Sequence, residues 1–207
     1  MVAGFGFVPN TELCVLAGCE HHFDTDIGGW VPSRDEHGET SVQGVFSAGD
    51  GAGVAGALVA TAEGRMAGIR AAEQAGALSP RAAAKRRKAP ERRLRSLGKV
   101  RSLLDEMSRL RPGLLELAAG DTLVCRCEEV SLDEVRAGLD EGAGDVQALK
   151  LLTRLGMGAC QGRTCGPIAV DLLCAAGAAP EEAGRVNPRP LTRPASLAAL
   201  AALKGAP

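Results

Sequence analysis

The chain has 207 residues and a formal net charge of −1 at pH 7, so its overall charge does not favour binding to nucleic acid. Hydrophobic residues make up 45% of the sequence, but aromatic residues only 2%, so we expect a core of Ala, Leu and Val. No apolar run approaches the roughly 18 residues of a membrane-spanning helix, which excludes such a span.

The first residues, Met1 to Pro9, lack a basic region followed by an apolar run, so no signal peptide is expected. The sequence therefore predicts a cytoplasmic protein, in a compartment where thiols stay reduced. Seven cysteines in that compartment favour metal binding or redox chemistry over structural disulfides.

Residues 1–76 are predicted to form the first unit. Within it, residues 12–16 favour a short helix, residues 30–32 an extended segment and residues 45–48 a buried strand.

A glycine-rich turn follows that predicted strand. Gly49 and Asp50 leave the strand, and residues 54–73 are rich in Ala without Pro, so we expect a long helix there. Free backbone N–H groups at the start of such a helix make a place for an anionic ligand. A simple turn over residues 49–51 is the alternative interpretation.

The run T-x4-V-F-x-A-G-D at residues 40–50 resembles the second FAD-binding motif of the pyridine nucleotide-disulfide oxidoreductase superfamily. Residues 6–11, GFVPNT, resemble the G-R-x-P-N-T stretch that precedes this motif, with Phe7 in the position of Arg. The resemblance implies that Asp50 hydrogen-bonds a ribitol hydroxyl of FAD and that the helix start faces the flavin. The cofactor-binding residues that it implies are Gly49, Asp50, Gly53, Val54 and Ala55.

The first FAD motif of that superfamily, GxGxxG between a strand and a helix, does not occur in the sequence. We therefore expect residues 1–76 to be the C-terminal segment of an FAD-binding domain, with an FAD site that is incomplete in this chain. Either the chain is a truncated or split reading frame, or another chain completes the site.

Residues 77–120 are predicted to be a basic linker and an amphipathic helix. Pro80 and Pro90 favour a linker, and apolar residues recur near helical spacing from Leu94 to Leu110. No aromatic platform accompanies the basic residues, so a solvated linker with a helix packed on the flavin segment is preferred to nucleic-acid binding. Docking to an acidic partner subunit is a further alternative. The basic residues are Arg81, Lys85, Arg86, Arg87, Lys88, Arg92, Arg93, Arg95, Lys99, Arg101, Arg109 and Arg111.

Four cysteines then stand in two pairs. Cys125 and Cys127 form a CxC pair, Cys160 and Cys165 form a CxxxxC pair, and residues 128–159 lie between the pairs. A helical hairpin in that interval can bring four thiolates around one metal centre. A 2Fe–2S cluster needs this number, because each iron takes two protein sulfurs. A four-cysteine zinc site is the alternative, although zinc sites more often use CxxC pairs.

The interval predicts two helices. Ser131 and Glu134 have the spacing of a capping box, and Asp145 is expected to cap the second helix. Four apolar residues of the second helix are predicted to face inward: Val146, Leu149, Leu152 and Leu155. Four glycines are expected to allow the backbone to approach the metal centre: Gly156, Gly158, Gly162 and Gly166.

Residues 121–176 resemble the bacterioferritin-associated-ferredoxin-like (BFD-like) 2Fe–2S domain. The C-x-C-x32-C-x4-C pattern and the run GMGACQGRTCGP at residues 156–167 carry this resemblance. It implies that the four paired cysteines are the metal ligands. The expected fold class is α+β overall: a partial FAD-binding α/β segment followed by a small all-α helical 2Fe–2S domain.

The remaining residues offer weaker signals. Residues 177–207 form a Pro/Ala-rich tail without visible chemistry, and no residue of the chain is predicted to be a catalytic acid or base. Cys14, Cys19 and Cys174 are expected to be buried small side chains, with a redox role for Cys14 and Cys19 as the alternative. Surface or packing roles are preferred to metal ligation for His21 and His22.

An FAD-motif segment followed by a BFD-like module resembles the alpha subunits of bacterial amine or imino-acid dehydrogenases, a group that includes opine oxidase, hydroxyproline or proline dehydrogenase and hydrogen cyanide synthase. The resemblance implies a 2Fe–2S cluster, FAD, and a second FAD-containing partner subunit of the amino-acid-oxidase type. Nucleic acid is not expected as a partner, and no membrane span is expected. A ferredoxin-like or zinc-stabilised interaction module without enzymatic activity is the alternative.

Overall fold

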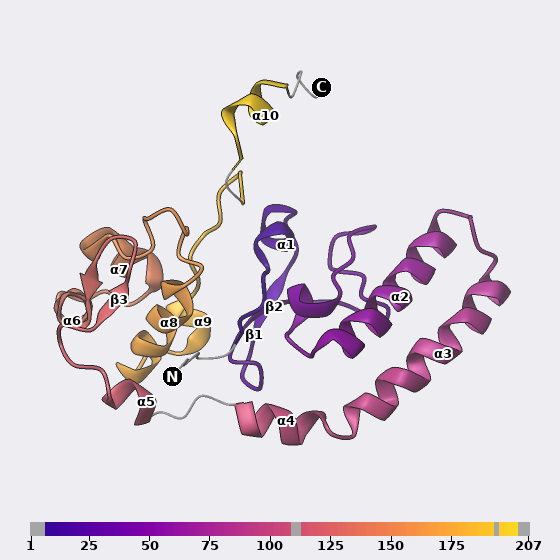
Figure 1. Cartoon of the computed structure of the whole chain (residues 1–207), viewed down its shortest axis with the longest axis horizontal. Helices are drawn as coiled ribbons and strands as arrows, with labels where there is room; N and C mark the ends of the chain where they lie inside the picture. The colour runs from indigo at the N-terminus through magenta and orange to yellow at the C-terminus, as the bar shows by residue number, and fades with distance from the viewer. Residues whose placement is uncertain (1–6, 109–112, 193–194, 203–207) are drawn as a thin grey trace.

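The computed structural model describes residues 7–108, 113–192 and 195–202, and its fold is α+β, as predicted (Figure 1). The first unit contains α1 (Glu12–Leu16), β1 (His21–Asp24), β2 (Gly29–Pro32), the 3₁₀ turn η1 (Gly49–Ala52) and α2 (Ala57–Gln74). The connector contains α3 (Pro80–Gly98), α4 (Arg101–Ser108) and α5 (Gly113–Glu116). The last part contains β3 (Leu123–Cys125), β4 (Val130–Ser131), α6 (Leu132–Asp140), α7 (Val146–Thr153), α8 (Cys165–Ala175), α9 (Pro180–Ala183) and α10 (Leu197–Ala202).

Strands β1 and β2 form an antiparallel hairpin in the first unit, in which Phe23 lies opposite Trp30. Their rings meet edge to face, with centroids 6.0 Å apart. The Asp24 carboxylate accepts hydrogen bonds from the backbone N–H groups of Asp26 and Ile27 and so fixes the turn. The predicted α1 and the extended segment at residues 30–32 are both confirmed.

The strand predicted at residues 45–48 is absent from the described structure, where Phe46 forms only a single bridge with Glu39. The long helix also begins later than predicted, at Ala57 rather than near residue 54. Gly53 and Gly56 have φ angles of 131° and 88°, outside the helical region, so the chain cannot enter the helix before Ala57.

The prolines of the connector do not make a linker, so that prediction is wrong. Ser79 caps α3 by accepting a hydrogen bond from the N–H of Ala82, and Pro80 occupies the first turn, where its missing donor costs nothing. Pro90 lies buried inside the same helix. Helix α3 packs along α2 (Figure 1), and an Arg87–Glu73 ion pair of 2.7 Å joins them.

The amphipathic helix predicted for the connector is divided in two. Helix α3 ends at Gly98 and α4 begins at Arg101, while Leu110 lies outside the described residues. None of the helices described is both long and apolar enough to cross a membrane.

The part of the chain with the four cysteines has its own buried core. Hairpin β3–β4 and helices α6, α7, α8 and α9 surround it, so the domain is not purely helical as predicted. The largest fully buried aliphatic side chains of this core are Val135, Val146, Leu149, Leu155 and Leu173.

The helix caps predicted for this core are confirmed. Ser131 and Glu134 form a complete capping box, and Asp145 accepts a hydrogen bond of 2.8 Å from the N–H of Ala148. Leu152 is 50% exposed, so its predicted inward orientation is wrong. It is one residue from Leu151, which is also exposed, on the outer face of α7.

The first unit contacts the cysteine-containing core through the β1–β2 hairpin, which lies between that core and α2 in Figure 1. The Trp30 indole N–H donates a hydrogen bond of 2.9 Å to the carbonyl of Gly184. The Arg185 guanidinium lies over the Trp30 ring, 5.4 Å from its centroid. Segment 184–189 therefore joins the two units.

Candidate functional site

The four paired cysteines come from three local structures. Cys125 ends β3, Cys127 lies in the turn between β3 and β4, Cys160 follows α7 and Cys165 begins α8. Cys125 and Cys165 are 1% exposed, whereas Cys127 is exposed and Cys160 half-buried. One side of the site is therefore buried in the core and the other faces solvent.

The thiols associate across the two sequence motifs. Burial is the main cause that raises the pKa of Cys165 to about 12. The thiol of Cys125, through a hydrogen bond and its charge, and the thiol of Cys160 raise it further. Burial also acts to raise the pKa of Cys160, but hydrogen bonds from the Thr164 backbone and the Cys127 thiol lower it overall. The four thiols are therefore close enough to interact: the pKa of Cys165 responds to Cys125 and Cys160, and that of Cys160 to Cys127.

Proximity of thiols from both motifs fits the demands of a two-iron cluster, in which each iron takes two protein sulfurs. Among the described residues, no three His, Cys, Asp or Glu side chains converge as ligands of a single metal ion. Cys125 and Cys165 are buried among apolar side chains, where thiolates are stable only beside a cation, and bound iron would supply that charge.

Gly158 allows the two cysteine motifs to approach each other. A Cβ atom at this position would lie 2.2 Å from the Cβ of Cys127, far inside van der Waals contact. Gly156, at φ 80°, is also close, because a Cβ there would lie 3.9 Å from the Cys165 sulfur. The predicted close approach is therefore confirmed at Gly158, whereas at Gly156 the positive φ, and not a lack of space, favours glycine.

Gly162 and Gly166 have a different role from the predicted one. A Cβ atom at Gly162 would lie 2.8 Å from the Val186 side chain, and one at Gly166 would lie 3.1 Å from it. These glycines make room for segment 184–189, a contact that sequence reasoning missed because the tail carries no recognised motif.

Two arginines near the cysteines differ in their surroundings. Arg126 is exposed to solvent. Arg163, between Cys160 and Cys165, forms an ion pair of 2.8 Å with Glu12 and donates to the carbonyl oxygens of Cys160 and Thr192. The Glu12 contact connects the first unit directly to the second cysteine pair.

The residues expected to contact FAD lie on one continuous segment, and the backbone N–H of Gly49 is not free there. It donates a hydrogen bond of 2.8 Å to the Glu63 carboxylate, which also pairs with Arg34 at 2.8 Å. This N–H is therefore not available to an anionic ligand. Asp50 is exposed at the turn.

The other expected FAD contacts precede α2. The buried Gly53 packs against Ile27, since a Cβ atom there would lie 2.6 Å from the Ile27 side chain. The Val54 carbonyl accepts a hydrogen bond of 2.7 Å from Arg101 of α4, and Ala55 is half-buried next to it. No spacing rule connects Arg101 with Val54, so this contact was not predictable from the sequence.

The remaining cysteines and histidines take part in local packing. Cys19 is buried and donates to the Thr40 hydroxyl at 3.2 Å, whereas Cys14 and Cys174 are only half-buried. His21 and His22 contact the Cys19 carbonyl and the Ser33 hydroxyl through Nδ1.

Comparison with known proteins agrees with this site. Residues 123–174 match the family of BFD-like 2Fe–2S binding domains. The HcnB subunit of hydrogen cyanide synthase from Pseudomonas protegens is 36% identical over 195 residues, covering 91% of this chain and 40% of the relative. An opine oxidase subunit of Rhizobium meliloti strain 1021 is 38% identical over 206 residues, covering 96% of this chain and 43% of the relative.

The corresponding opine oxidase subunit of Agrobacterium tumefaciens is 33% identical over 200 residues, covering 96% of this chain. The chain spans about 40% of the length of these curated relatives. No solved structure matches the chain. The chain therefore contains a BFD-like 2Fe–2S binding domain and is homologous to these subunits of opine oxidase and hydrogen cyanide synthase.

Proposed function

We propose that this chain is an electron-transferring subunit, or part of one, of an FAD-dependent amine or imino-acid dehydrogenase. The association of Cys125 with Cys165 and of Cys127 with Cys160, inside a domain of the BFD-like family, carries the proposal. These four cysteines are the proposed ligands of a 2Fe–2S cluster.

The chemical role of the cluster follows from electron counts. A flavin accepts two electrons from an amine substrate, whereas a 2Fe–2S centre carries one electron at a time. The protein holds the cluster partly in its core and partly at the surface, through the buried Cys165 and the exposed Cys127. Electrons can therefore leave or enter on the side of Cys127 and Cys160.

The first unit is proposed to be the C-terminal segment of an FAD-binding domain, joined by residues 77–120 to the cluster domain at residues 121–176. The exposed Asp50 is available for a ribitol hydroxyl, and Gly49, Gly53, Val54 and Ala55 are its proposed neighbours in the site. The site lacks the GxGxxG motif, so the pyrophosphate requires a segment outside these residues.

The substrate class and the partner come from the relatives. Their names describe subunits of opine oxidase and of hydrogen cyanide synthase, so a multi-subunit enzyme that oxidises an amine or imino acid is proposed. A second FAD-containing subunit of the amino-acid-oxidase type is the proposed partner, which would hold the substrate and pass electrons to this chain.

Anaerobic purification with metal analysis tests the cluster. We expect two irons and two sulfides per chain, a visible charge-transfer absorption, and an electron paramagnetic resonance signal after one-electron reduction. Cys160→Ser should abolish cluster assembly, whereas Cys174→Ser should leave it unchanged. A colourless chain with one equivalent of zinc and no iron would instead show a zinc-stabilised module. Flavin content and co-purification of a second flavoprotein chain test the remainder of the proposal.

A further inference from the structure

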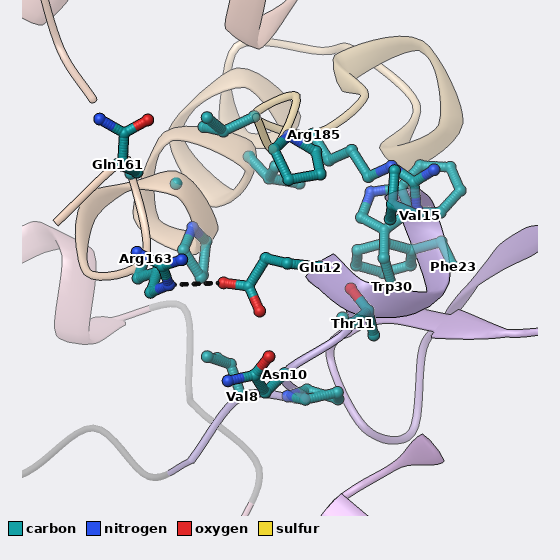
Figure 2. A pocket seen from close by; sticks show the side chains of 18 of the residues that line it. Val8, Asn10, Thr11, Glu12, Val15, Phe23, Trp30, Gln161, Arg163 and Arg185 are labelled. Carbon is teal, nitrogen blue, oxygen red and sulfur yellow. Dashed lines mark ion pairs between the residues drawn. The ribbon is translucent and has the colours of Figure 1, made fainter. Parts of the chain in front are cut away.

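A cavity of about 220 Å³ lies between the first unit and the cluster domain (Figure 2). The first unit contributes Asn10, Glu12, Phe23 and Trp30 to its wall, and α8 and segment 184–189 close the opposite side. None of the proposed FAD contacts or cysteine ligands lines it. Its volume suits a molecule smaller than a typical drug-sized ligand.

Arg185 brings an unpaired positive charge to this cavity. Its Nη1 atom is buried without a hydrogen-bond partner, and its guanidinium contacts the face of Trp30 instead of a carboxylate. Figure 2 shows Arg185 beside Phe23 and Trp30, at some distance from the Glu12–Arg163 ion pair. Burial lowers the pKa of Arg185, because no neighbouring anion compensates for the loss of water.

Asp171 of α8 brings an unpaired negative charge to the same cavity. Its carboxylate makes no hydrogen bond or ion pair within the described residues, and burial raises its pKa. Arg185 and Asp171 do not affect each other's pKa, so they do not form a direct pair. Two opposite charges that are partly buried but unpaired are costly to the fold unless a ligand compensates for both.

The rest of the wall is largely apolar. Phe23, Trp30, Val170 and Val186 line it together with several prolines, so the ligand must also carry an apolar group. The charges of Glu12 and Arg163 are already satisfied by each other, at 2.8 Å. Among the described residues of this wall, Arg185 and Asp171 therefore remain as partly buried charges without a hydrogen-bonded or ionic partner, whereas Arg189 is exposed to solvent.

We propose that this cavity binds a free amino acid with an apolar side chain. Its carboxylate would accept hydrogen bonds from Arg185, its ammonium group would donate to Asp171, and its side chain would pack on Trp30. This assignment does not depend on the proposed function, because it needs neither FAD nor a cluster. Gln161 and Gly162, within the second cysteine motif, also line the cavity, so a bound ligand would contact the cluster-binding loop.

Fluorescence offers a direct test, because Trp30 is the only Trp in the chain and there is no Tyr. The 207-residue chain would be titrated with L-leucine, with 4-methylpentanoate, which lacks the ammonium group, and with 3-methylbutylamine, which lacks the carboxylate. We expect a saturable change with L-leucine and about tenfold or more weaker binding of each monofunctional analogue, since one charged hydrogen bond is lost. Isothermal titration calorimetry would check each affinity.

Variants distinguish the roles of the two charges. Arg185→Gln and Asp171→Asn should each weaken L-leucine binding by about tenfold or more. Asp171→Asn should leave the affinity for 4-methylpentanoate unchanged, whereas Arg185→Gln should reduce it. Arg136→Gln, at an exposed position on α6, is the matched control and should bind L-leucine like the parent chain. Circular dichroism would confirm that each variant is folded, and Asp171→Asn decides the question if Arg185→Gln does not fold.

The proposal is overturned if L-leucine produces no saturable change in either measurement. It is also overturned if 4-methylpentanoate binds as tightly as L-leucine, because the cavity would then recognise a simple carboxylate. Equal weakening by Arg136→Gln and Asp171→Asn would place the binding elsewhere on the chain.

Discussion

The Glu12 carboxylate and the Arg163 guanidinium form an ion pair of 2.8 Å that joins the first unit to the loop between Cys160 and Cys165. Their side chains are 21% and 30% exposed, so the pair is only partly screened by water. Because Arg163 also donates to the Cys160 carbonyl at 3.1 Å, the first unit helps to fix the position of a proposed cluster ligand.

Glu12→Gln should therefore destabilise the chain by about 1 kcal/mol, because Arg163 loses its charged partner while remaining half-buried. Chemical denaturation followed by circular dichroism measures this difference. Glu20→Gln, which changes an exposed carboxylate in the same unit, is the control and should have no measurable effect. Equal stability of the two variants would mean that the ion pair contributes nothing to the interface.

Gly158→Ala should prevent normal cluster loading. The added Cβ would lie 2.2 Å from the Cβ of Cys127, so one of the two cysteine motifs must shift, at about 1–3 kcal/mol in stability. Iron and sulfide content per chain and thermal unfolding would measure the effect.

Gly144→Ala is the matched control for this substitution. A Cβ atom at Gly144 has no neighbour within 4 Å, and the backbone there needs no positive φ, so full iron content is expected. Normal cluster content in Gly158→Ala would contradict the packing seen between the motifs.

The metal-free chain should react with iodoacetamide in a defined order at pH 8. The reactive species is the thiolate, and hydrogen bonds from Thr164 and Cys127 lower the pKa of Cys160 despite its partial burial. Cys165, with a pKa of about 12, stays protonated and buried and should react last. Mass spectrometry of quenched samples would record the order. Faster modification of Cys165 than of Cys160 would be incompatible with the arrangement of the thiols.

Glu63→Gln should destabilise the first unit by about 1–3 kcal/mol. The Glu63 carboxylate accepts from the Gly49 N–H and pairs with Arg34, and its loss leaves a partly buried guanidinium without an anion. Unfolding followed by Trp30 fluorescence would measure the change. Glu36→Gln, whose side chain is 87% exposed, serves as the control. A similar stability for both variants would show that the Gly49 turn does not depend on Glu63.

Local sequence signals predicted the helix caps correctly. The side chains of Ser131, Glu134 and Asp145 bond to backbone groups three residues away along the chain. The spacing of these residues in the sequence is therefore enough to predict the hydrogen bonds. The close approach at Gly158 was predictable for a similar reason, because the cysteine motif indicates where the backbone must lie close to the other cysteine pair.

Long-range contacts were not predictable in this way. The buried strand expected at residues 45–48 is absent from the described structure, and Pro90 lies inside a helix that packs on α2. In both places tertiary packing overrides the local preference. The contacts of Glu12 with Arg163 and of Arg101 with Val54 join residues that no motif relates.

The hydrogen bond from Trp30 to Gly184 has a consequence for the order of folding. These residues are 154 positions apart, so the β1–β2 hairpin leaves the ribosome long before its partner segment exists. The cysteine-containing core, whose helices follow one another closely, can form from short-range contacts. Its docking against the hairpin must come last, after the large loop between them has closed. A nascent chain that stops before residue 184 lacks the partner of the Trp30 indole. The exposed indole is then a binding site for chaperones that recognise aromatic surface.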